Sequence, residues 1–140
     1  MPVKRVTPAE AHQLCLEGWA YVDVRSIPEF EAGHPPSAYN IPLMHFAPGR
    51  GMAPNAEFAA VFARHFGKDT PVVMGCKTGG RSLRAAEMLA ELGYARIVDM
   101  RGGFAGEADM TGRVMQPGWQ ESGLPVEQVA QPGRTYEQLK

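Results

Sequence analysis

Cysteine is scarce in this sequence of 140 residues, which contains only Cys15 and Cys76. Two cysteines allow one disulfide at most, so a fold built on a disulfide framework is excluded. The sequence also lacks a run of about 18 apolar residues, and no apolar segment follows Met1–Arg5. It therefore predicts neither a membrane-spanning helix nor a secretory signal. We expect a cytoplasmic protein whose two thiols stay reduced.

An excess of charge is lacking as well, because 14 Lys and Arg residues face 15 Asp and Glu residues, for a formal net charge of -1. This balance argues against bulk electrostatic binding to nucleic acid or to an anionic membrane. Glycine and proline, by contrast, are abundant, with 16 and 12 copies. Many turns are therefore expected, which excludes a coiled coil or a simple helix bundle.

The length of the chain fits one compact domain over residues 1–140. A chain of this size buries roughly two-thirds of its unfolded surface, so its core needs neither disulfides nor a structural metal. We place this core at about residues 5–127. The polar C-terminal tail, residues 128–140, is expected to pack loosely or to fray.

Apolar runs of strand length alternate with segments of helical spacing along the chain. Helices are predicted around residues 7–17, 26–32, 58–66 and 82–92, and strands around 19–24, 38–43, 71–75 and 96–100. These strands are apolar throughout, which is typical of a parallel sheet covered on both faces. The segment 45–55, rich in glycine and proline, is predicted to be a loop at the rim of a site.

The turn between the strand at 71–75 and the next helix carries the most informative residues, Cys76-Lys77-Thr78-Gly79-Gly80-Arg81-Ser82. Sites in open parallel sheets form beyond the carboxyl ends of strands. The two glycines allow successive backbone N–H groups to turn inward, and the helix start adds its positive dipole end. Such a loop stabilises a thiolate, so we expect Cys76 to be a nucleophile rather than a structural cysteine at a strand end.

Four motifs in order resemble the single-domain rhodanese family of thiosulfate sulfurtransferases. Together they span about residues 5–127 and comprise Asp23-Val24-Arg25 through Asn40-Ile41-Pro42, the loop Cys76–Ser82, Arg101-Gly102-Gly103-Phe104 and Gly123-Leu124-Pro125-Val126. The resemblance implies a rhodanese-like α/β domain with about five parallel strands and helices on both faces.

The resemblance also implies a reaction. Cys76 would take a sulfane sulfur from thiosulfate or a similar anionic donor, become a persulfide, and pass the sulfur to cyanide or a thiol, including the thiol of an acceptor protein. The backbone of Lys77, Thr78, Gly79, Gly80 and Arg81 would cradle the persulfide, with the charges of Lys77 and Arg81 attracting the donor. Ser82 would cap the helix or bond to the cradle. No cofactor is implied.

Two other functions remain open. The related cell-cycle phosphatases and arsenate reductases resemble C-x5-R, whereas four residues separate Cys76 from Arg81 here. The shorter ring of amides suits one sulfur atom better than a tetrahedral phosphate, which favours sulfur transfer. The second alternative is a sulfur-relay or protein-binding module with little intrinsic turnover.

Several residues have both a structural and a functional interpretation. Arg25 either faces the anion pocket or pairs with Asp23, and the ion pair is the preferred interpretation because buried charges are usually partnered. Cys15 is assigned to the core, with a resolving cysteine as the alternative. A metal site is not expected, because the four histidines and two cysteines lack ligand spacing.

One departure from the family pattern lies between Gly103 and Trp119, where the family has a Trp soon after its glycine pair. We interpret residues 109–117 as part of an insertion at the carboxyl end of a strand. This insertion and the 45–55 segment are expected to form the rim that selects the sulfur acceptor, although a packing role for the insertion remains open.

Overall fold

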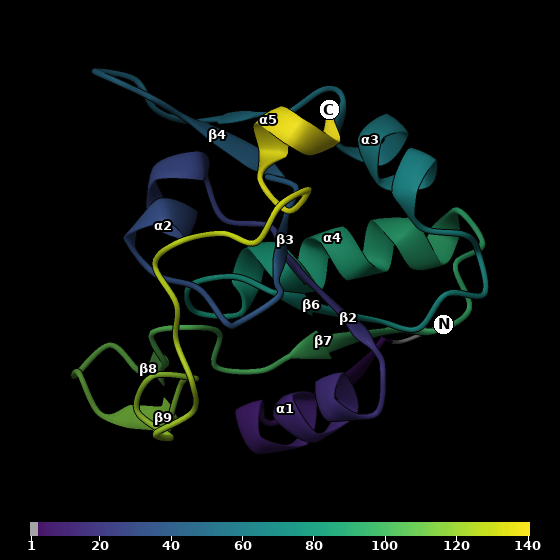
Figure 1. Cartoon of the computed structure of the whole chain (residues 1–140). Helices are drawn as coiled ribbons and strands as arrows, with labels where there is room; N and C mark the ends of the chain where they lie inside the picture. Colours follow the sequence, from purple (N-terminus) through teal and green to yellow (C-terminus); the bar gives the residue numbers. More distant parts are fainter. Residues whose placement is uncertain (1–2) are drawn as a thin grey trace.

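Five parallel strands form the central sheet of the structure, a computed structural model that describes residues 3–140. Their order across the sheet is β1-β7-β6-β2-β3, and Figure 1 shows them between layers of helices. The bounds are β1 Lys4–Val6, β2 Ala20–Asp23, β3 Tyr39–Asn40, β6 Val72–Gly75 and β7 Ile97–Met100. Because all neighbours pair in parallel, the carboxyl ends of these strands meet at one edge.

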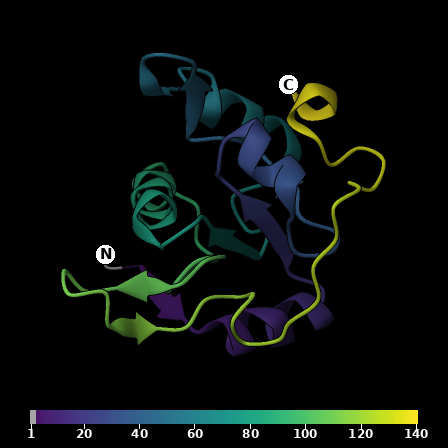
Figure 2. The same ribbon diagram turned by 90° about the vertical axis from the view of Figure 1, so that its left-hand side faces the viewer.

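Helices cover both faces of the sheet, as the sequence predicts (Figure 2). Residues of α3, α4 and α5 share one core cluster with Val22 and Met74 of the sheet. On the opposite face, α1 packs with Tyr21, Val73 and Trp119 in a second cluster. None of the helices within residues 3–140 is long and apolar enough to cross a bilayer. The helices are α1 Pro8–Leu16, α2 Ile27–Ala32, α3 Phe58–His65, α4 Gly80–Glu91 and α5 Tyr136–Leu139.

The helix starts follow the capping patterns in the sequence. Thr7 accepts the N–H of Glu10 while the Glu10 carboxylate accepts the N–H of Thr7, and α1 begins after this box. Ser26 and Glu29 form the corresponding box at α2. Reciprocal bonds of this kind satisfy N–H groups that a helix start leaves without partners. They also fix Glu29 at the edge of the sheet where the strands end.

The structure differs from the sequence-based prediction at both edges of the central sheet and in two hairpins. β1 was not predicted, because only one of its three residues is buried and no apolar run marks it. The strand expected at 38–43 is limited to β3. The 45–55 segment is a hairpin rather than a loop, with strands β4 Met44–Ala47 and β5 Gly51–Pro54. A second hairpin, β8 Glu107–Ala108 and β9 Val114–Gln116, occupies the insertion.

The C-terminal segment packs against the body, so the expectation that it packs loosely is wrong. Tyr136 and Leu139 of α5 are buried in the core cluster that contains α3. The Tyr136 hydroxyl accepts a hydrogen bond from Asn55 at 3.2 Å, and the Leu139 carbonyl oxygen lies 2.6 Å from His65 Nε2. Most of the other residues in the segment are polar, which explains why its composition indicates a tail. We propose that residues 1–140 form a single domain.

Replacement of Leu139 tests this packing. We expect Leu139→Ala to lower the free energy of unfolding by about 2–4 kcal/mol, because it removes a buried side chain from a packed core. Val129 in the same segment is 82% exposed, so Val129→Ala is the matched control and should change stability by less than about 0.5 kcal/mol. Urea denaturation followed by circular dichroism measures both, and equal effects would contradict the described packing.

Candidate active site

Cys76 lies directly after β6, at the carboxyl edge of the sheet, and α4 begins four residues later at Gly80. β6 is the middle strand of the sheet, flanked by β7 and β2. The residue is 1% exposed and belongs to the core cluster on the α3 and α4 face. The sequence-predicted position of Cys76 at a strand-to-helix turn is therefore confirmed.

Gly79 gives the loop its shape. Its φ of 106° is in the left-handed region, which favours glycine, and its N–H donates a hydrogen bond to Cys76 Sγ at 3.1 Å. Gly80 is exposed and is simply the first residue of α4. Of the two glycines expected to let the backbone turn inward, only Gly79 has positive φ. The Gly79 N–H is thus directed at the Cys76 sulfur.

The segment after β7 holds the cysteine loop from the other side. Phe104 N–H donates to the Cys76 carbonyl at 2.7 Å, and Ala105 N–H donates to the Lys77 carbonyl at 2.8 Å. Gly103 has a φ of 63°, and a Cβ there would lie 2.5 Å from the carbonyl carbon of Lys77. The loop can approach this closely only because residue 103 lacks a side chain.

A third contact reaches the loop from β1. Arg5 Nε donates to Asp99 Oδ2 at 2.9 Å, and Arg5 Nη2 lies 3.4 Å from the Gly79 carbonyl oxygen. Ser82 Oγ donates to the same carbonyl at 3.4 Å. Arg5 and Ser82 therefore fix the residue whose N–H reaches the cysteine sulfur.

Asp99 is the buried anchor of this contact. Burial raises its pKa to about 6, although hydrogen bonds from Ser82 and Arg5 act in the opposite direction. Glu87 on α4 adds to the rise through its own negative charge. Its Oδ1 atom has no hydrogen-bond partner among the described residues. Asp99 is thus a carboxyl group that folding makes harder to ionise.

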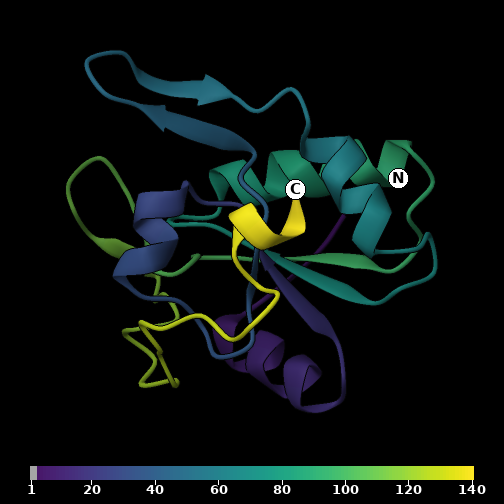
Figure 3. The same ribbon diagram turned by 45° about the horizontal axis from the view of Figure 1, so that its top comes forward.

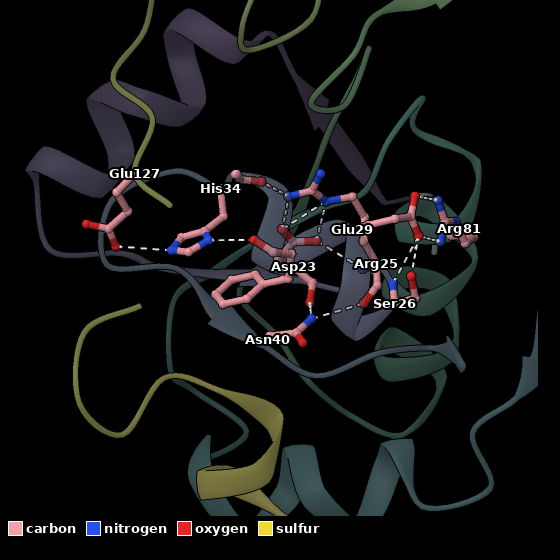
Figure 4. Close-up of polar contacts among 10 residues, drawn as sticks. Asp23, Arg25, Ser26, Glu29, His34, Asn40, Arg81 and Glu127 are labelled. Atoms are coloured by element: carbon pink, nitrogen blue, oxygen red, sulfur yellow. Dashed lines mark hydrogen bonds and ion pairs between the residues drawn. The ribbon is translucent and has the colours of Figure 1, made fainter. Parts of the chain in front are cut away.

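The two cations of the loop have different surroundings. Arg81 forms a two-point ion pair with Glu29 of α2, at 2.8 Å and 3.0 Å, as Figure 4 shows. Burial alone would raise the pKa of Glu29, but hydrogen bonds from Arg81 and Ser26 outweigh it and lower the pKa to about 2. Lys77 is exposed and makes no ion pair with any of residues 3–140. Lys77 alone therefore keeps an uncompensated charge on the loop.

Arg25 is tied to Asp23 in the buried network drawn in Figure 4. Its Nη2 lies 2.7 Å from Asp23 Oδ2 and 2.6 Å from the Gly33 carbonyl oxygen, and its guanidinium stacks 4.3 Å from the Phe104 ring centroid. Asn40 donates to the carbonyls of both Asp23 and Arg25. This arrangement agrees with the preferred interpretation of Arg25 as a structural ion-pair residue.

Two open grooves meet at Lys77 and Glu29. The larger, with a volume of about 680 Å³, lies between α2 and the β4–β5 hairpin. The smaller, about 270 Å³, is bounded by Arg25, Phe104 and Gln120. Of the two segments expected to form a rim, the 45–55 hairpin lines the larger groove through Phe46, Gly51 and Met52. The β8–β9 hairpin lines neither groove, and Figure 2 shows it on the side of α1.

Cys15 packs away from this site. It borders the second core cluster, on the sheet face opposite to Cys76, and both cysteines are free. Burial raises the pKa of the Cys15 thiol to about 11, which makes it a poor nucleophile. No group of three or more potential metal ligands occurs among residues 3–140.

Sequence reasoning missed Arg5, Asp99 and the partnership of Glu29 with Arg81. A charged residue inside the apolar run at 96–100 was a usable signal, because a buried aspartate requires a partner. The sequence could not identify Arg5 as that partner, because Arg5 is 94 positions away and lies on a strand without an apolar pattern.

Comparisons with known proteins agree with this geometry. Residues 7–108 match the family described as Rhodanese-like domain. Thiosulfate sulfurtransferase 16, chloroplastic, of Arabidopsis thaliana is 34% identical over 121 residues, which cover 86% of this chain and 90% of that protein. Senescence-associated protein DIN1 of Raphanus sativus is 35% identical over 118 residues, 84% of this chain but 57% of that protein.

A solved structure is also similar. The crystal structure of Rv0390 from M. tuberculosis superposes with a TM-score of 0.76 and 26% sequence identity, over 92% of this chain and all of that chain (100%).

A pair of glycine substitutions tests the geometry of the loop. We expect Gly79→Ala to lower the free energy of unfolding by about 1–2 kcal/mol, because positive φ is unfavourable for alanine. Its Cβ would also lie 3.0 Å from Arg5 Nη2. Gly80→Ala is the control, because no atom lies within 4 Å of its Cβ, and alanine favours a helix by up to about 1 kcal/mol. Urea denaturation of both variants provides the comparison, and a Gly80→Ala cost equal to that of Gly79→Ala would refute the assignment.

The raised pKa of Asp99 predicts a specific pH dependence of stability. The folded carboxyl keeps its proton up to about pH 6, while the unfolded one loses it near the ordinary value of 3.8. This contribution to stability is therefore complete below the unfolded pKa and is lost as the pH rises through about 6. The stability of the wild type relative to Asp99→Asn should increase between about pH 7.5 and about pH 5.

Glu29→Gln serves as the control for this measurement. The lowered pKa of Glu29 gives stability that is present above the unfolded value of 4.5 and lost as the pH falls toward about 2. Its difference from the wild type should stay constant over the same interval, from about pH 7.5 to about pH 5. Urea denaturation at each pH decides, and a constant difference for Asp99→Asn would count against a carboxyl of raised pKa.

Proposed function

Because this chain belongs to the rhodanese-like domain family, we propose that it is a sulfurtransferase that carries sulfane sulfur on Cys76 as a persulfide. The donor is thiosulfate or a similar anion, and the acceptor is cyanide or a thiol. The observation that supports this most directly is the hydrogen bond from Gly79 N–H to Cys76 Sγ within a ring that has four residues between Cys76 and Arg81. An N–H group directed at the Cys76 sulfur suits a reaction in which this sulfur is first the nucleophile and then the leaving group.

The first half of the reaction loads the cysteine. The Cys76 thiolate attacks the outer sulfur of thiosulfate, a new S–S bond forms, and the bond to the sulfonate sulfur breaks. The electron pair of that bond leaves with sulfite, so no external oxidant or reductant is required. Lys77, the loop cation without an ion pair in the described chain, attracts the dianionic donor. Gly79 N–H stabilises the negative charge on the cysteine before attack and near the persulfide afterwards.

The second half discharges the persulfide. Cyanide or a thiolate attacks the outer sulfur, forms a C–S or S–S bond with it, and leaves the electron pair of the broken S–S bond on Cys76 Sγ. Thiocyanate or an organic persulfide departs, and the thiolate is ready for another cycle. Hydrogen bonds from Phe104 and Ala105 N–H to the Cys76 and Lys77 carbonyls hold the loop in place during this step.

One observation favours a second candidate, a sulfur carrier that hands its persulfide to a protein and turns over slowly alone. Cys76 is 1% exposed, so small acceptors have little direct access to its sulfur. A docking protein that displaces the loop would then control discharge. Phosphate hydrolysis has less support, because the ring around Cys76 is one residue shorter than in C-x5-R enzymes.

Sulfur loading provides the decisive experiment. After incubation with thiosulfate, intact-mass analysis of the wild type should show a gain of one sulfur atom, which peptide mapping places on Cys76. Cys76→Ser should fold normally and show no gain, while the matched variant Cys15→Ser should load like the wild type. Rapid thiocyanate release on addition of cyanide supports the enzyme, and a persulfide that survives cyanide supports the carrier. Absence of any sulfur gain in the wild type would refute both.

A further inference from the structure

The larger groove beside the cysteine loop has walls that thiosulfate and cyanide do not require. Pro28 and Ala32 of α2 form one side, and Phe46 and Met52 of the β4–β5 hairpin form the other. Figure 3 shows this hairpin projecting from the body of the protein on the side of α2. Phe46 is 53% exposed although it is a large aromatic residue. The groove therefore keeps apolar surface in contact with water next to the site.

The size of the groove exceeds that of the inorganic substrates. Its volume of about 680 Å³ falls in the range of roughly 300–1,000 Å³ that pockets for organic ligands occupy. Thiosulfate and cyanide are small ions with strongly bound water, and neither gains from apolar walls. An organic molecule with a hydrocarbon portion does gain, at roughly 0.8 kcal/mol for each methylene removed from water.

The charged residues that line the groove indicate which charge a bound organic molecule would carry. Glu29 and Arg81 both line it, but each neutralises the other in their two-point ion pair. Lys77 also lines it and has no ion-pair partner within residues 3–140. Since Lys77 follows Cys76 directly in the chain, the groove borders the cysteine loop at this residue. The groove thus combines apolar walls with one available cation.

We propose that this groove binds the sulfur acceptor, and that the acceptor is an organic thiol with an apolar chain and one anionic group. The inference rests on the proposed function, because it assigns the thiol to the second half of that reaction. The chain lies against Phe46 and Met52, and the anionic group pairs with Lys77. The thiolate attacks the outer sulfur of the Cys76 persulfide, an S–S bond forms on the acceptor, and the electron pair of the broken bond returns to Cys76 Sγ.

Single-turnover discharge of persulfide-loaded protein tests this assignment with three thiols. Mercaptohexanoate has both features, mercaptopropionate has a shorter chain, and mercaptohexanol lacks the charge. We expect discharge at low thiol concentration to be about tenfold faster for mercaptohexanoate than for mercaptopropionate, as partial burial of three methylenes implies. Mercaptohexanol should also discharge more slowly than mercaptohexanoate, because it has no anionic group to pair with Lys77. The double variant Phe46→Ser/Met52→Ser should lose the preference for chain length, and Lys77→Gln should lose the preference for the charged thiol.

Two controls separate this inference from the proposed function. Met110→Ser removes an exposed apolar side chain from the other hairpin and should keep both preferences. Cyanide discharge should be unchanged in Phe46→Ser/Met52→Ser, since cyanide makes no use of the apolar walls. Failure of the wild type to load sulfur, or to release it to any acceptor, refutes the proposed function. Normal cyanide discharge with equal rates for the three thiols, or with preferences that survive in Phe46→Ser/Met52→Ser, overturns the groove assignment alone.

Discussion

The backbone contact between the Cys76 loop and the segment after β7 is the constraint on which the site depends. Two carbonyls that follow a buried strand need donors, and Phe104 and Ala105 N–H supply them at 2.7 Å and 2.8 Å. The contact is possible only where Gly103 has no side chain. With the Cys76 and Lys77 carbonyls held on that side, the loop presents the Gly79 N–H to the sulfur. The geometry around the Cys76 sulfur therefore depends on close packing against the segment that follows the next strand, β7.

Most of the charged side chains around the site are neutralised by an ion-pair partner. Asp23 holds Arg25, and Glu29 holds Arg81. The Asp99 carboxylate anchors Arg5 behind Gly79. Each pair holds a segment that borders the loop. Moving that segment would separate the pair and leave an uncompensated charge, which is unfavourable. Among the described residues, Lys77 is the one cation of the loop that has no ion-pair partner, and it also lines the adjoining groove.

Helices and inner strands were readable from the sequence, whereas edge elements were not. The capping boxes at Thr7 and Ser26 and the apolar run at 71–75 carry local physical signals, so their predicted positions agree with the structure. β1 and the β4–β5 hairpin have few buried side chains, and they are strands because they pair with another strand rather than because of an apolar pattern. The same limit explains the C-terminal segment, where only Tyr136 and Leu139 are buried in the core.

By itself, the sequence determined the cysteine loop, its size and the family, because Cys76 to Ser82 is contiguous and the motif depends on residue types at fixed spacing. Only the tertiary structure decided which of the described charged side chains have an ion-pair partner. Arg81 and Lys77 look equivalent in the sequence, yet α2 brings Glu29 against one of them and leaves the other unpaired among the described residues. It also decided that Arg5 reaches Gly79, from 74 positions away. Charge compensation depends on distances in space, and sequence separation does not report those distances.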